Sequence, residues 1–391
     1  MLLLNFYLRI FLITLFTSFN CSMVFSQQST MEITGKVIDA QSNQPLSGAT
    51  VYLDHTTKAT ISSDSGSFVL KNIPSGNYKL IVSYIGYNSA FADLSENNIP
   101  NLIVELTPGV KLLDEVAITA NPNWQEYFLL FKMFFLGKGG QYCTIKNPKT
   151  LSFDHNDTSY VLTAQAGKPL IIENQALGYR IYYELNSFVH YAGRTSYSGY
   201  TRFEEMTAAN SKEQKKWKSN REKAYLGSSV HFMRSLVNKT SKEEGFVMKK
   251  LVKANLRKSE ENEFKSTDTI VTMQWNGRNY FAKDTTVLSG AGSLISRSKV
   301  GYDLLYPEEL PYDSVVTANL NGNYKLSFNN SLFVIYKKKK NVTSILTMLT
   351  PETFVDTHGN LANPQAVLHE GYWATLRIAD QLPFDYLPDK D

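Results

Sequence analysis

Four residues near the C-terminus have the side chains that hydrolytic or metal chemistry requires: Asp356, His358, His369 and Glu370. The first pair reads as part of one turn and the second pair as part of another. A hairpin between the turns could bring the two imidazoles together as a metal site or an acid–base pair. The 11-residue spacing matches no known site template, and histidines in turns are commonly polar turn residues only. A hydrolase built on His358, His369 and Glu370 is therefore kept as the alternative hypothesis, with His358 and His369 as candidate metal ligands.

Other catalytic signatures are missing from the sequence. It contains no Gly-x-Ser-x-Gly nucleophile elbow, and the glycine-rich stretch 137–140 lacks the strand–loop–helix context of a phosphate loop. Cys143 could act as a nucleophile, but its neighbours Tyr142, Thr144 and Ile145 indicate a small buried residue in a strand. We expect no cofactor.

Binding chemistry is the other interpretation of the same chain. Aromatic side chains present large flat faces that can stack on sugar rings. The candidates are the four tryptophans, Trp124, Trp217, Trp275 and Trp373. The sequence alone does not say which of them is exposed.

The first 26 residues are typical of a secretory signal peptide. Their apolar run is interrupted by Arg9 and is shorter than the ~20 residues of a bilayer-spanning helix. Val24-Phe25-Ser26 provides a cleavage site after Ser26. Lipidation at Cys21 is disfavoured because Asn20 replaces the small residue expected before a lipidated cysteine. We therefore predict an exported protein, and cleavage would leave Cys143 unable to form an intramolecular disulfide.

Positive charge is concentrated in residues 210–260, which carry 14 Lys and Arg against five Glu, whereas the whole chain has a net charge of +4. The basic residues of segment 212–223 surround Trp217. At helical spacing, Lys212, Lys216 and Lys223 share one side, as on a solvated helix face. The alternative is a peripheral contact of this segment with anionic lipid headgroups or an acidic partner. Nucleic acid is not expected as a partner of an exported protein.

Residues 33–107 contain an ordered series of turn motifs, each beside a short alternating strand. In chain order they are Gly35-Lys36-Val37-Ile38-Asp39, Pro45-Leu46-Ser47-Gly48-Ala49-Thr50-Val51, Asp64-Ser65-Gly66-Ser67-Phe68, Ile73-Pro74-Ser75-Gly76-Asn77-Tyr78 and Tyr84-Ile85-Gly86-Tyr87. Strands are expected at about 33–39, 49–54, 58–62, 67–71, 77–85 and 101–106. The pattern predicts a small β-sandwich.

This series resembles the carboxypeptidase-regulatory-like domain, a transthyretin-like Greek-key sandwich of seven strands that is also classed with carbohydrate-binding-like folds. The stretch 113–119 resembles the strand that leads to the plug of starch-utilisation-type TonB-dependent receptors of Bacteroidetes. The resemblance covers about a fifth of the chain. It implies a non-catalytic accessory module, so no catalytic residues carry over from it.

Two kinds of protein associated with this domain are not expected here. No plug follows Ile118, and a 22-stranded barrel at ~10 residues per strand plus loops does not fit the remaining chain. None of the six histidines begins a His-x-x-Glu, and His-Glu-x-x-His is absent, so the zinc spacing of a metallocarboxypeptidase is missing. We expect neither a complete receptor nor a carboxypeptidase.

The chain after a boundary at 121–123 is predicted to form one larger antiparallel β-rich α+β domain, with a helical insertion near 210–240. Residues 124–136 read as an apolar helix ended by Gly137. We interpret it as a core helix packed on a sheet; a membrane-surface or receptor-docking helix is the alternative. Asn276-Gly277 and Asn321-Gly322 predict hairpins.

Three segments are therefore predicted: a signal peptide at 1–26, a carboxypeptidase-regulatory-like β-sandwich at 27–120 and a β-rich domain of unknown function at 121–391. The fold class is mainly β. The leading functional hypothesis is a non-catalytic exported protein of the periplasm or outer membrane that binds or scaffolds a glycan or an outer-membrane protein partner.

Overall fold

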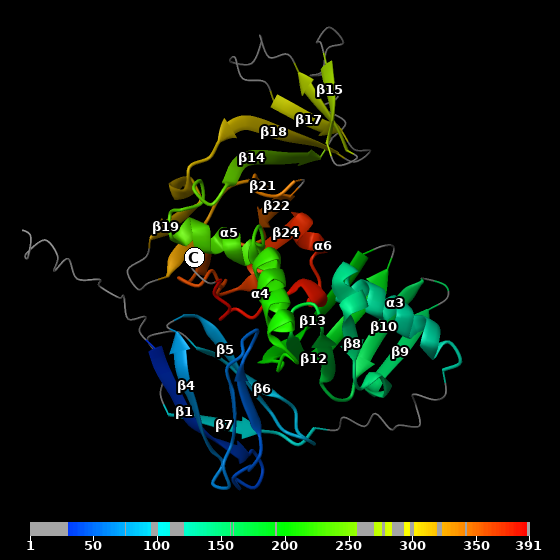
Figure 1. The fold of residues 1–391 in the computed structure, drawn as a ribbon, viewed down its shortest axis with the longest axis vertical. Coiled ribbons are helices and arrows are strands. Elements are labelled where there is room, and N and C mark those ends of the chain that lie inside the picture. The colour runs from blue at the N-terminus through cyan, green and yellow to red at the C-terminus, as the bar shows by residue number, and fades with distance from the viewer. Residues whose placement is uncertain are drawn as a thin grey trace, which may run out of the picture.

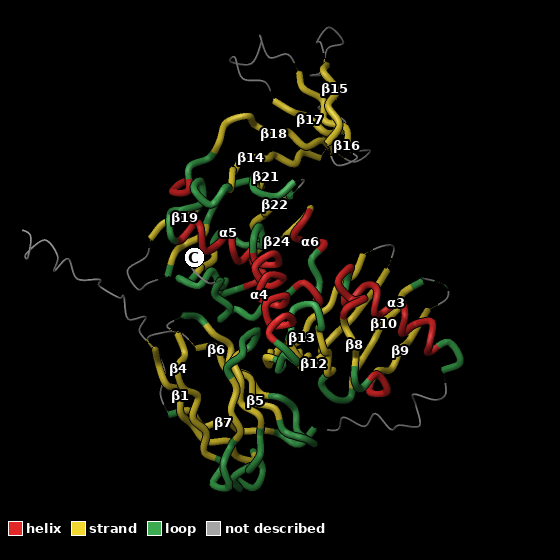
Figure 2. The backbone as a smooth tube through the Cα atoms, viewed as in Figure 1, coloured by secondary structure: helices red, strands yellow, loops and turns green. Residues whose placement is uncertain are grey.

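The computed structural model describes residues 30–74, 76–94, 101–109, 121–156, 158, 160–191, 194–255, 270–275, 278–283, 293–297, 301–318, 323–340 and 342–388. The predicted signal peptide, Cys21, the stretch 113–119 and the two Asn-Gly turns lie outside the described residues. Strands dominate the fold, as predicted, with helices between and against the sheets (Figure 2).

The N-terminal sandwich consists of two sheets, drawn in blue and cyan in Figure 1. One sheet has the strand order β4-β1-β7 and the other the order β3-β2-β5-β6. The strands are β1 Thr30–Asp39, β2 Thr50–Leu53, β3 Ala59–Ile61, β4 Ser67–Pro74, β5 Tyr78–Ser83, β6 Ala90–Leu94 and β7 Leu102–Leu106. The predicted seven-stranded sandwich is confirmed. Strand β6 is the one strand that the turn motifs did not indicate.

Gly35 shows why the first motif of the sandwich contains a glycine. Strand β1 pairs with β4 on one side and with β7 on the other. A Cβ atom at position 35 would lie 2.4 Å from the carbonyl oxygen of Leu102 and 2.6 Å from the ring of Phe68. Any larger residue would push β1 away from its neighbours, so glycine is required by close approach.

A six-stranded antiparallel sheet follows, in the order β8-β11-β12-β10-β9 with β13 paired to β12. Its strands are β8 Cys143–Ile145, β9 Leu151–Asn156, β10 Val161–Ala166, β11 Leu170–Asn174, β12 Tyr179–Tyr191 and β13 Arg194–Glu205. Helix α3, Trp124–Leu136, packs against this sheet (Figure 1). The short 3-10 helix Lys138–Tyr142 leads from α3 to β8, and the 3-10 helix Pro148–Thr150 joins β8 to β9.

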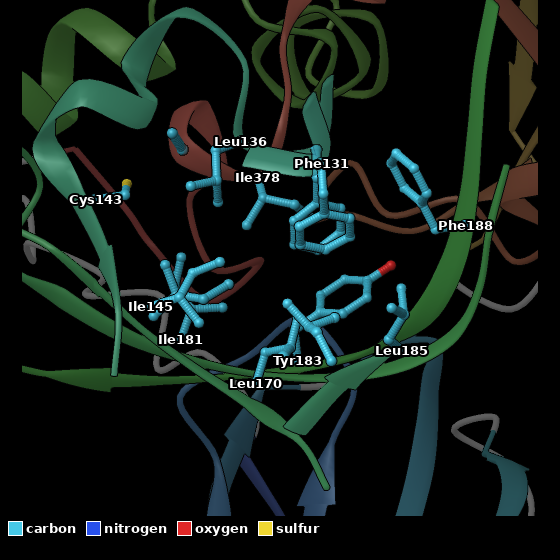
Figure 3. Packing of buried hydrophobic residues seen from close by; sticks show 14 of the residues in the cluster. Phe131, Leu136, Cys143, Ile145, Leu170, Ile181, Tyr183, Leu185, Phe188 and Ile378 are labelled. Carbon is cyan, nitrogen blue, oxygen red and sulfur yellow. The ribbon is translucent and has the colours of Figure 1, made fainter. Parts of the chain in front are cut away.

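Helix α3 is a core helix, as the preferred interpretation predicted. Phe131 and Phe135 are fully buried. The ring of Phe131 contacts that of Phe188 in β12 with centroids 4.8 Å apart (Figure 3). The ring of Phe135 contacts that of Tyr183 in the same strand with centroids 5.0 Å apart. The helix ends at Gly137, whose φ is +77°. Burial of its aromatic face against β12 therefore fixes the helix on the sheet.

Cys143 lies in β8 at the edge of the same core and is 4% exposed (Figure 3). Burial raises the pKa of the Cys143 thiol to about 12. A thiol with this pKa is uncharged at neutral pH and is a poor nucleophile. The predicted role of a small buried residue in a strand is confirmed.

An eight-stranded antiparallel sheet forms the third region, in the order β15-β16-β17-β18-β14-β21-β22-β24. Its strands are β14 Phe246–Asn255, β15 Ile270–Trp275, β16 Arg278–Lys283, β17 Ser293–Arg297, β18 Gly301–Glu309, β21 Ser331–Tyr336, β22 Thr343–Met348 and β24 Val367–Gly371. A small sheet of β19 Val316–Ala318, β20 Tyr324–Leu326 and β23 Thr353–Val355 lies beside it. The strand pairs β15–β16 and β19–β20 confirm both predicted hairpins.

Helices α4, Ser211–Tyr225, and α5, Ser229–Val237, lie between the two large sheets (Figure 1), within the segment predicted as a helical insertion. The remaining helices are α6 Tyr372–Thr375 and the 3-10 helices Tyr312–Ser314, Pro364–Ala366 and Ile378–Asp380. None of the helices among the described residues has the length and apolar character needed to span a membrane.

Two large apolar cores and one small cluster are found among the described residues after 121. One large core belongs to the six-stranded sheet and the other to the eight-stranded sheet and α5, and the small cluster of Leu251, Leu305, Phe333 and Ile345 lies within the eight-stranded sheet. The C-terminal segment, residues 376–388, returns from the eight-stranded sheet to the six-stranded one, where Ile378 is buried in the core (Figure 3). Ala379 is buried in the same core.

Candidate functional site

The predicted turn at 356–360 is present, and Asp356 organises it. Asp356 is 2% exposed, and its Oδ1 accepts the backbone N–H groups of His358 and Asn360 at 2.8 and 2.9 Å. Its Oδ2 accepts the N–H of Asn77 from the sandwich at 3.1 Å. Burial raises the pKa of Asp356, although the hydrogen bonds from Asn360 and Asn77 oppose the effect. This carboxyl therefore has a structural role, because it closes a turn and ties that turn to the sandwich.

His369 and Glu370 lie in strand β24, so the turn predicted for them is wrong. Successive side chains of a strand point to opposite faces. Glu370 forms an ion pair with Lys253 of β14, whereas His369 meets the ring of Trp373 edge-on at 5.7 Å. The predicted hairpin failed because pairing of β24 with β22 extends the chain as far as Gly371, whose φ of +70° makes the turn.

The structure consequently separates the residues of the hydrolase hypothesis. His358 is buried in its own turn, and its carbonyl accepts Nε of Arg234 at 2.6 Å. Glu370 faces Lys253 on the side of β24 away from His369. Within the part of the chain that the structure describes, no three His, Cys, Asp or Glu side chains are grouped as a metal would require.

Arg234 holds the C-terminal segment in place. Besides the bond to His358, its Nη1 and Nη2 donate to the carbonyls of Tyr386 and Phe384, each at 2.8 Å. Arg234 is 6% exposed, so these three charge-assisted bonds are sheltered from water. One side chain of α5 thus joins the 356–360 turn to the end of the chain.

The tryptophans proposed as sugar platforms are packing residues where the structure describes them. Trp217 and Trp373 are 4% and 6% exposed, and their Nε1 atoms donate to the carbonyls of Gln175 and Gly227 at 2.9 and 2.8 Å. Trp124 is half-buried, stacks on Phe128 and donates to Leu151 at 3.0 Å. The side chain of Trp275 is not among those that the structure describes.

Gly178 leaves the space that the indole ring of Trp217 occupies. The residue has a φ of +69°, and a Cβ there would lie 2.2 Å from the indole ring. The indole consequently lies flat on the backbone after β11, where α4 is anchored. Asn220 and Arg221, one turn further along α4, donate to the carbonyls of Ala176 and Leu177 at 2.8 and 2.7 Å.

The basic helix α4 has two different sides. Its inner side carries Trp217 and Arg221 against the six-stranded sheet, and Tyr225 further along the helix contacts His231 and Tyr386. Lys212, Lys216 and Lys223 are exposed, as the solvated-face interpretation predicted. Lys339, from the hairpin between β21 and β22, donates to the carbonyl of Lys223 at 3.4 Å and so extends the basic surface at the end of the helix.

A cleft of about 740 Å³ lies between α4, the sandwich and the C-terminal segment. We call it the interdomain cleft. The residues that line it are Thr57, Tyr179, Glu205, Met206, Ala208, Ser211, Gln214, Lys215, Trp217, Lys218, Arg221, Pro383, Asp385, Tyr386 and Leu387. Its wall is rich in hydrogen-bonding groups of both charges. Arg221 pairs with Glu205 at 3.3 Å, and Asp385 accepts the N–H and the hydroxyl of Thr57.

The sandwich loop 54–57 fixes the walls of this cleft relative to one another. His55 donates its N–H to the carbonyl of Thr201 at 2.7 Å and accepts the N–H of Phe384 at its own carbonyl, also at 2.7 Å. Its ring stacks on Phe384 with centroids 5.0 Å apart. Asp54 accepts the N–H of Thr201 at 2.7 Å. Backbone hydrogen bonds of this kind make the cleft a preformed feature.

Sequence reasoning missed Thr57 and Asp385, which line the cleft, and Arg234, which holds the C-terminal segment in place. Each is isolated in the sequence and gains its role from partners more than 100 residues away. One signal was the C-terminal stretch 383–388, in which aromatic and acidic residues stand between two prolines. Such a stretch favours an extended segment held by its neighbours.

Several solved structures align with parts of this chain at low identity and low TM-score. A cohesin–X-dockerin complex chain from Acetivibrio cellulolyticus is 21% identical, with a TM-score of 0.16; the alignment covers 20% of this chain and 51% of that one, so about half its length is spanned. A protein from Bacteroides uniformis proposed to bind carbohydrate is 10% identical over 45% of this chain and 98% of its own, with a TM-score of 0.16.

A protein of unknown function from Bacteroides fragilis, proposed to associate with membranes, is 13% identical over 72% of this chain and 98% of its own, with a TM-score of 0.17. No curated protein matches the chain in sequence. The match that carries weight is to a family model, described as "CarboxypepD_reg-like domain", over residues 33–118. It indicates no catalytic family. The N-terminal sandwich of this chain is a carboxypeptidase-regulatory-like domain.

Proposed function

We propose that this chain is an exported, non-catalytic glycan-binding protein of the cell envelope, and that the interdomain cleft holds the glycan. The observation that carries the proposal is the cleft itself. It is large, its walls come from the sandwich, α4 and the C-terminal segment, and backbone hydrogen bonds hold those walls together. A preformed site loses little conformational entropy when a ligand binds.

The chemistry of the cleft fits a hydroxyl-rich chain. Lys215, Lys218 and Arg221 offer donors, and Glu205 and Asp385 offer acceptors. Sugar hydroxyls are both donors and acceptors, so one glycan can satisfy groups of both kinds. The mixture of charges argues against a purely anionic or purely cationic ligand.

The state of the two carboxylates supports binding over hydrolysis. A glycosidase needs two carboxyl groups that flank the scissile bond and are free to act as acid and base or nucleophile. Here Glu205 is engaged by Arg221, and Asp385 is engaged by Thr57. Both groups thus contribute to the architecture of the cleft.

A protein partner at the outer membrane is the second candidate. The outward side of α3 supports it, since Leu129 and Met133 are 58% and 55% exposed one turn apart. Two adjacent apolar side chains are a small surface, well below what a stable interface buries. We rank this candidate below the cleft for that reason.

The test is an array of envelope and plant polysaccharides probed with residues 27–391, followed by calorimetry on each bound glycan. We expect Lys215→Ala/Lys218→Ala to weaken binding at least about tenfold, through loss of two charged donors. The matched control, Lys212→Ala/Lys216→Ala, removes the same charge from the outer side of the same helix and should bind like wild type. Equal loss in both pairs, or no bound glycan, contradicts the proposal.

Export is tested separately. In a Bacteroidetes host we expect the mature protein to begin at Gln27, as measured by intact mass, and to appear in the envelope fraction. Replacement of Cys21 by Ser should leave that distribution unchanged. A mature protein that begins at Cys21 and carries lipid would contradict the predicted cleavage after Ser26.

A further inference from the structure

One side of helix α4 forms a wall of the interdomain cleft. Five of its residues recur at intervals of three or four positions and line the cleft: Ser211, Gln214, Lys215, Lys218 and Arg221. Residues at this spacing are neighbours on one face of a helix. The helix as a whole contains six Lys and Arg but only two Glu. One wall of the cleft is therefore strongly basic.

The charges that line the cleft do not cancel. Arg221 and Glu205 neutralise each other in an ion pair of 3.3 Å. Asp385 supplies the second carboxylate, and its two oxygens accept the N–H and the hydroxyl of Thr57. Among the described residues, by contrast, the ammonium group of Lys215 has no carboxylate partner. Lys215 therefore offers a ligand a positive charge that the described side chains leave unpaired.

Other lysines of α4 add to this positive charge. Lys218 lies one turn after Lys215 on the same face and also lines the cleft. Lys212 and Lys216 are exposed on the outer side of the helix. A cleft with an excess of one sign of charge concentrates ligands of the opposite sign and increases their rate of association. Helix α4 should therefore attract an anionic group, which Lys215 and Lys218 would meet inside the cleft.

The remaining wall of the cleft does not suit a bare inorganic anion. Glu205 and Asp385 would repel such an ion, whereas their oxygens accept hydrogen bonds from hydroxyl groups. Leu387 is 54% exposed and, with Pro383, adds apolar surface from the C-terminal segment. A matching ligand has hydroxyl groups, C–H surface and a negative charge on the same unit. An acidic sugar has this combination, because its ring carries the hydroxyl groups and its carboxylate or sulfate ester can pair with lysine.

We propose that the interdomain cleft is specific for glycans that contain acidic units, and that Lys215 and Lys218 bind the carboxylate or sulfate group of such a unit. The inference rests on the proposed function, because it names the class of glycan that the cleft holds. The two are separable by experiment, since a cleft that binds only neutral glycans would agree with the proposed function and contradict the inference.

The experiment compares matched pairs of polysaccharides by calorimetry on residues 27–391. Polygalacturonate and alginate are each measured beside their methyl esters, and dextran sulfate is measured beside dextran. At least one acidic polysaccharide should bind about tenfold or more tightly than its neutral counterpart, because its acidic group forms charge-assisted hydrogen bonds with lysine. An increase in NaCl from about 0.05 to about 0.5 M should weaken binding of the acidic member only. The pair that shows this difference distinguishes a carboxylate from a sulfate.

Variants of α4 locate the charge that the ligand recognises. Lys215→Gln/Lys218→Gln should reduce the preference for the acidic polysaccharide by about fivefold or more, whereas Lys215→Arg/Lys218→Arg should keep most of it. Lys212→Gln/Lys216→Gln is the matched control, because it removes the same charge from the outer side of the helix, and it should keep the preference. All four lysines are exposed, so each variant should fold, as its melting temperature verifies.

If no acidic polysaccharide binds more tightly than its neutral counterpart, the inference is wrong, and a neutral glycan bound in the cleft would leave the proposed function intact. Equal losses in the two Gln variants would also overturn the inference, because they would show a general attraction to a basic helix. Absence of binding by every polysaccharide of the array, charged or neutral, would overturn the proposed function as well.

Discussion

The N-terminal sandwich and the two sheets that follow it build their cores in different ways. The sandwich closes its core with side chains from its own strands, such as Ile33 and Leu80. The core of the six-stranded sheet includes Ile378 and Ala379, which come from the C-terminal segment of the chain. A module that forms its whole core from its own residues can fold independently. A sheet whose core includes residues from the far end of the chain can complete that core only when the end of the chain is in place.

Deletion of residues 376–391 should have the largest effect on the difference between the sandwich and the two sheets that follow it. The deletion opens the core around Ile378 and removes the contacts of Phe384 and Asp385 with the sandwich loop. We expect the C-terminal half to lose its cooperative unfolding transition, while the sandwich retains its own. Differential scanning calorimetry measures both transitions.

A fragment of residues 27–109 is the matched control for that deletion and should unfold cooperatively alone. Retention of both transitions in the shortened chain would show that the C-terminal half does not depend on its last segment. Loss of the sandwich transition would show that the module is not independent.

Replacement of Arg234 by Ala should have the next largest effect. It leaves the carbonyls of His358, Phe384 and Tyr386 without their donor in a buried place. We expect a loss of about 3–5 kcal/mol in the free energy of unfolding of the C-terminal half, measured with urea. Lys212→Ala, at an exposed position of α4, should change it by less than about 0.5 kcal/mol. Equal effects of the two variants would show that the hydrogen bonds of Arg234 do not stabilise the C-terminal half.

A smaller effect is expected from pH. Burial lowers the pKa of His369 to about 4 from an unfolded value near 6.5. Between these values the unfolded chain binds a proton that the folded chain does not, so the stability contributed above pH 6.5 is lost as pH falls toward 4. The loss should reach about 2–3 kcal/mol at pH 4.5.

His369→Phe isolates this contribution from that of other titrating groups. The free energy of unfolding of the variant should fall less between pH 7 and pH 4.5 than that of the wild type, by the same 2–3 kcal/mol. Parallel pH curves for the two proteins would show that His369 is not held neutral by burial.

The same contrast explains how much the sequence predicted. The sandwich was readable because each turn motif and its strand are neighbours in the chain, and helix α3 was readable because its apolar run ends at Gly137. Strand β6 was missed because Ala90–Leu94 is short and only weakly alternating. The sequence pattern was sufficient wherever residues that are close together in the chain determine the turn, strand or helix.

The candidate site could not be predicted in this way. His369 and Glu370 read as a turn, but pairing with β22 made them part of a strand and sent them to opposite faces. Trp217 and Trp373 read as binding residues, but Gly178 and Gly227 give them places in the interior. Thr57 and Asp385 are 328 positions apart and became neighbours only through the fold.

The central claim is that the interdomain cleft binds a glycan and leaves it intact. The most direct measurement combines calorimetry with a reducing-end assay on the tightest polysaccharide from the array, using wild type, His358→Ala and His369→Ala. We predict saturable binding by the wild type and by His358→Ala, with no new reducing ends in any sample after prolonged incubation. Reducing ends released by the wild type and lost in either histidine variant would contradict the account and establish the hydrolase instead.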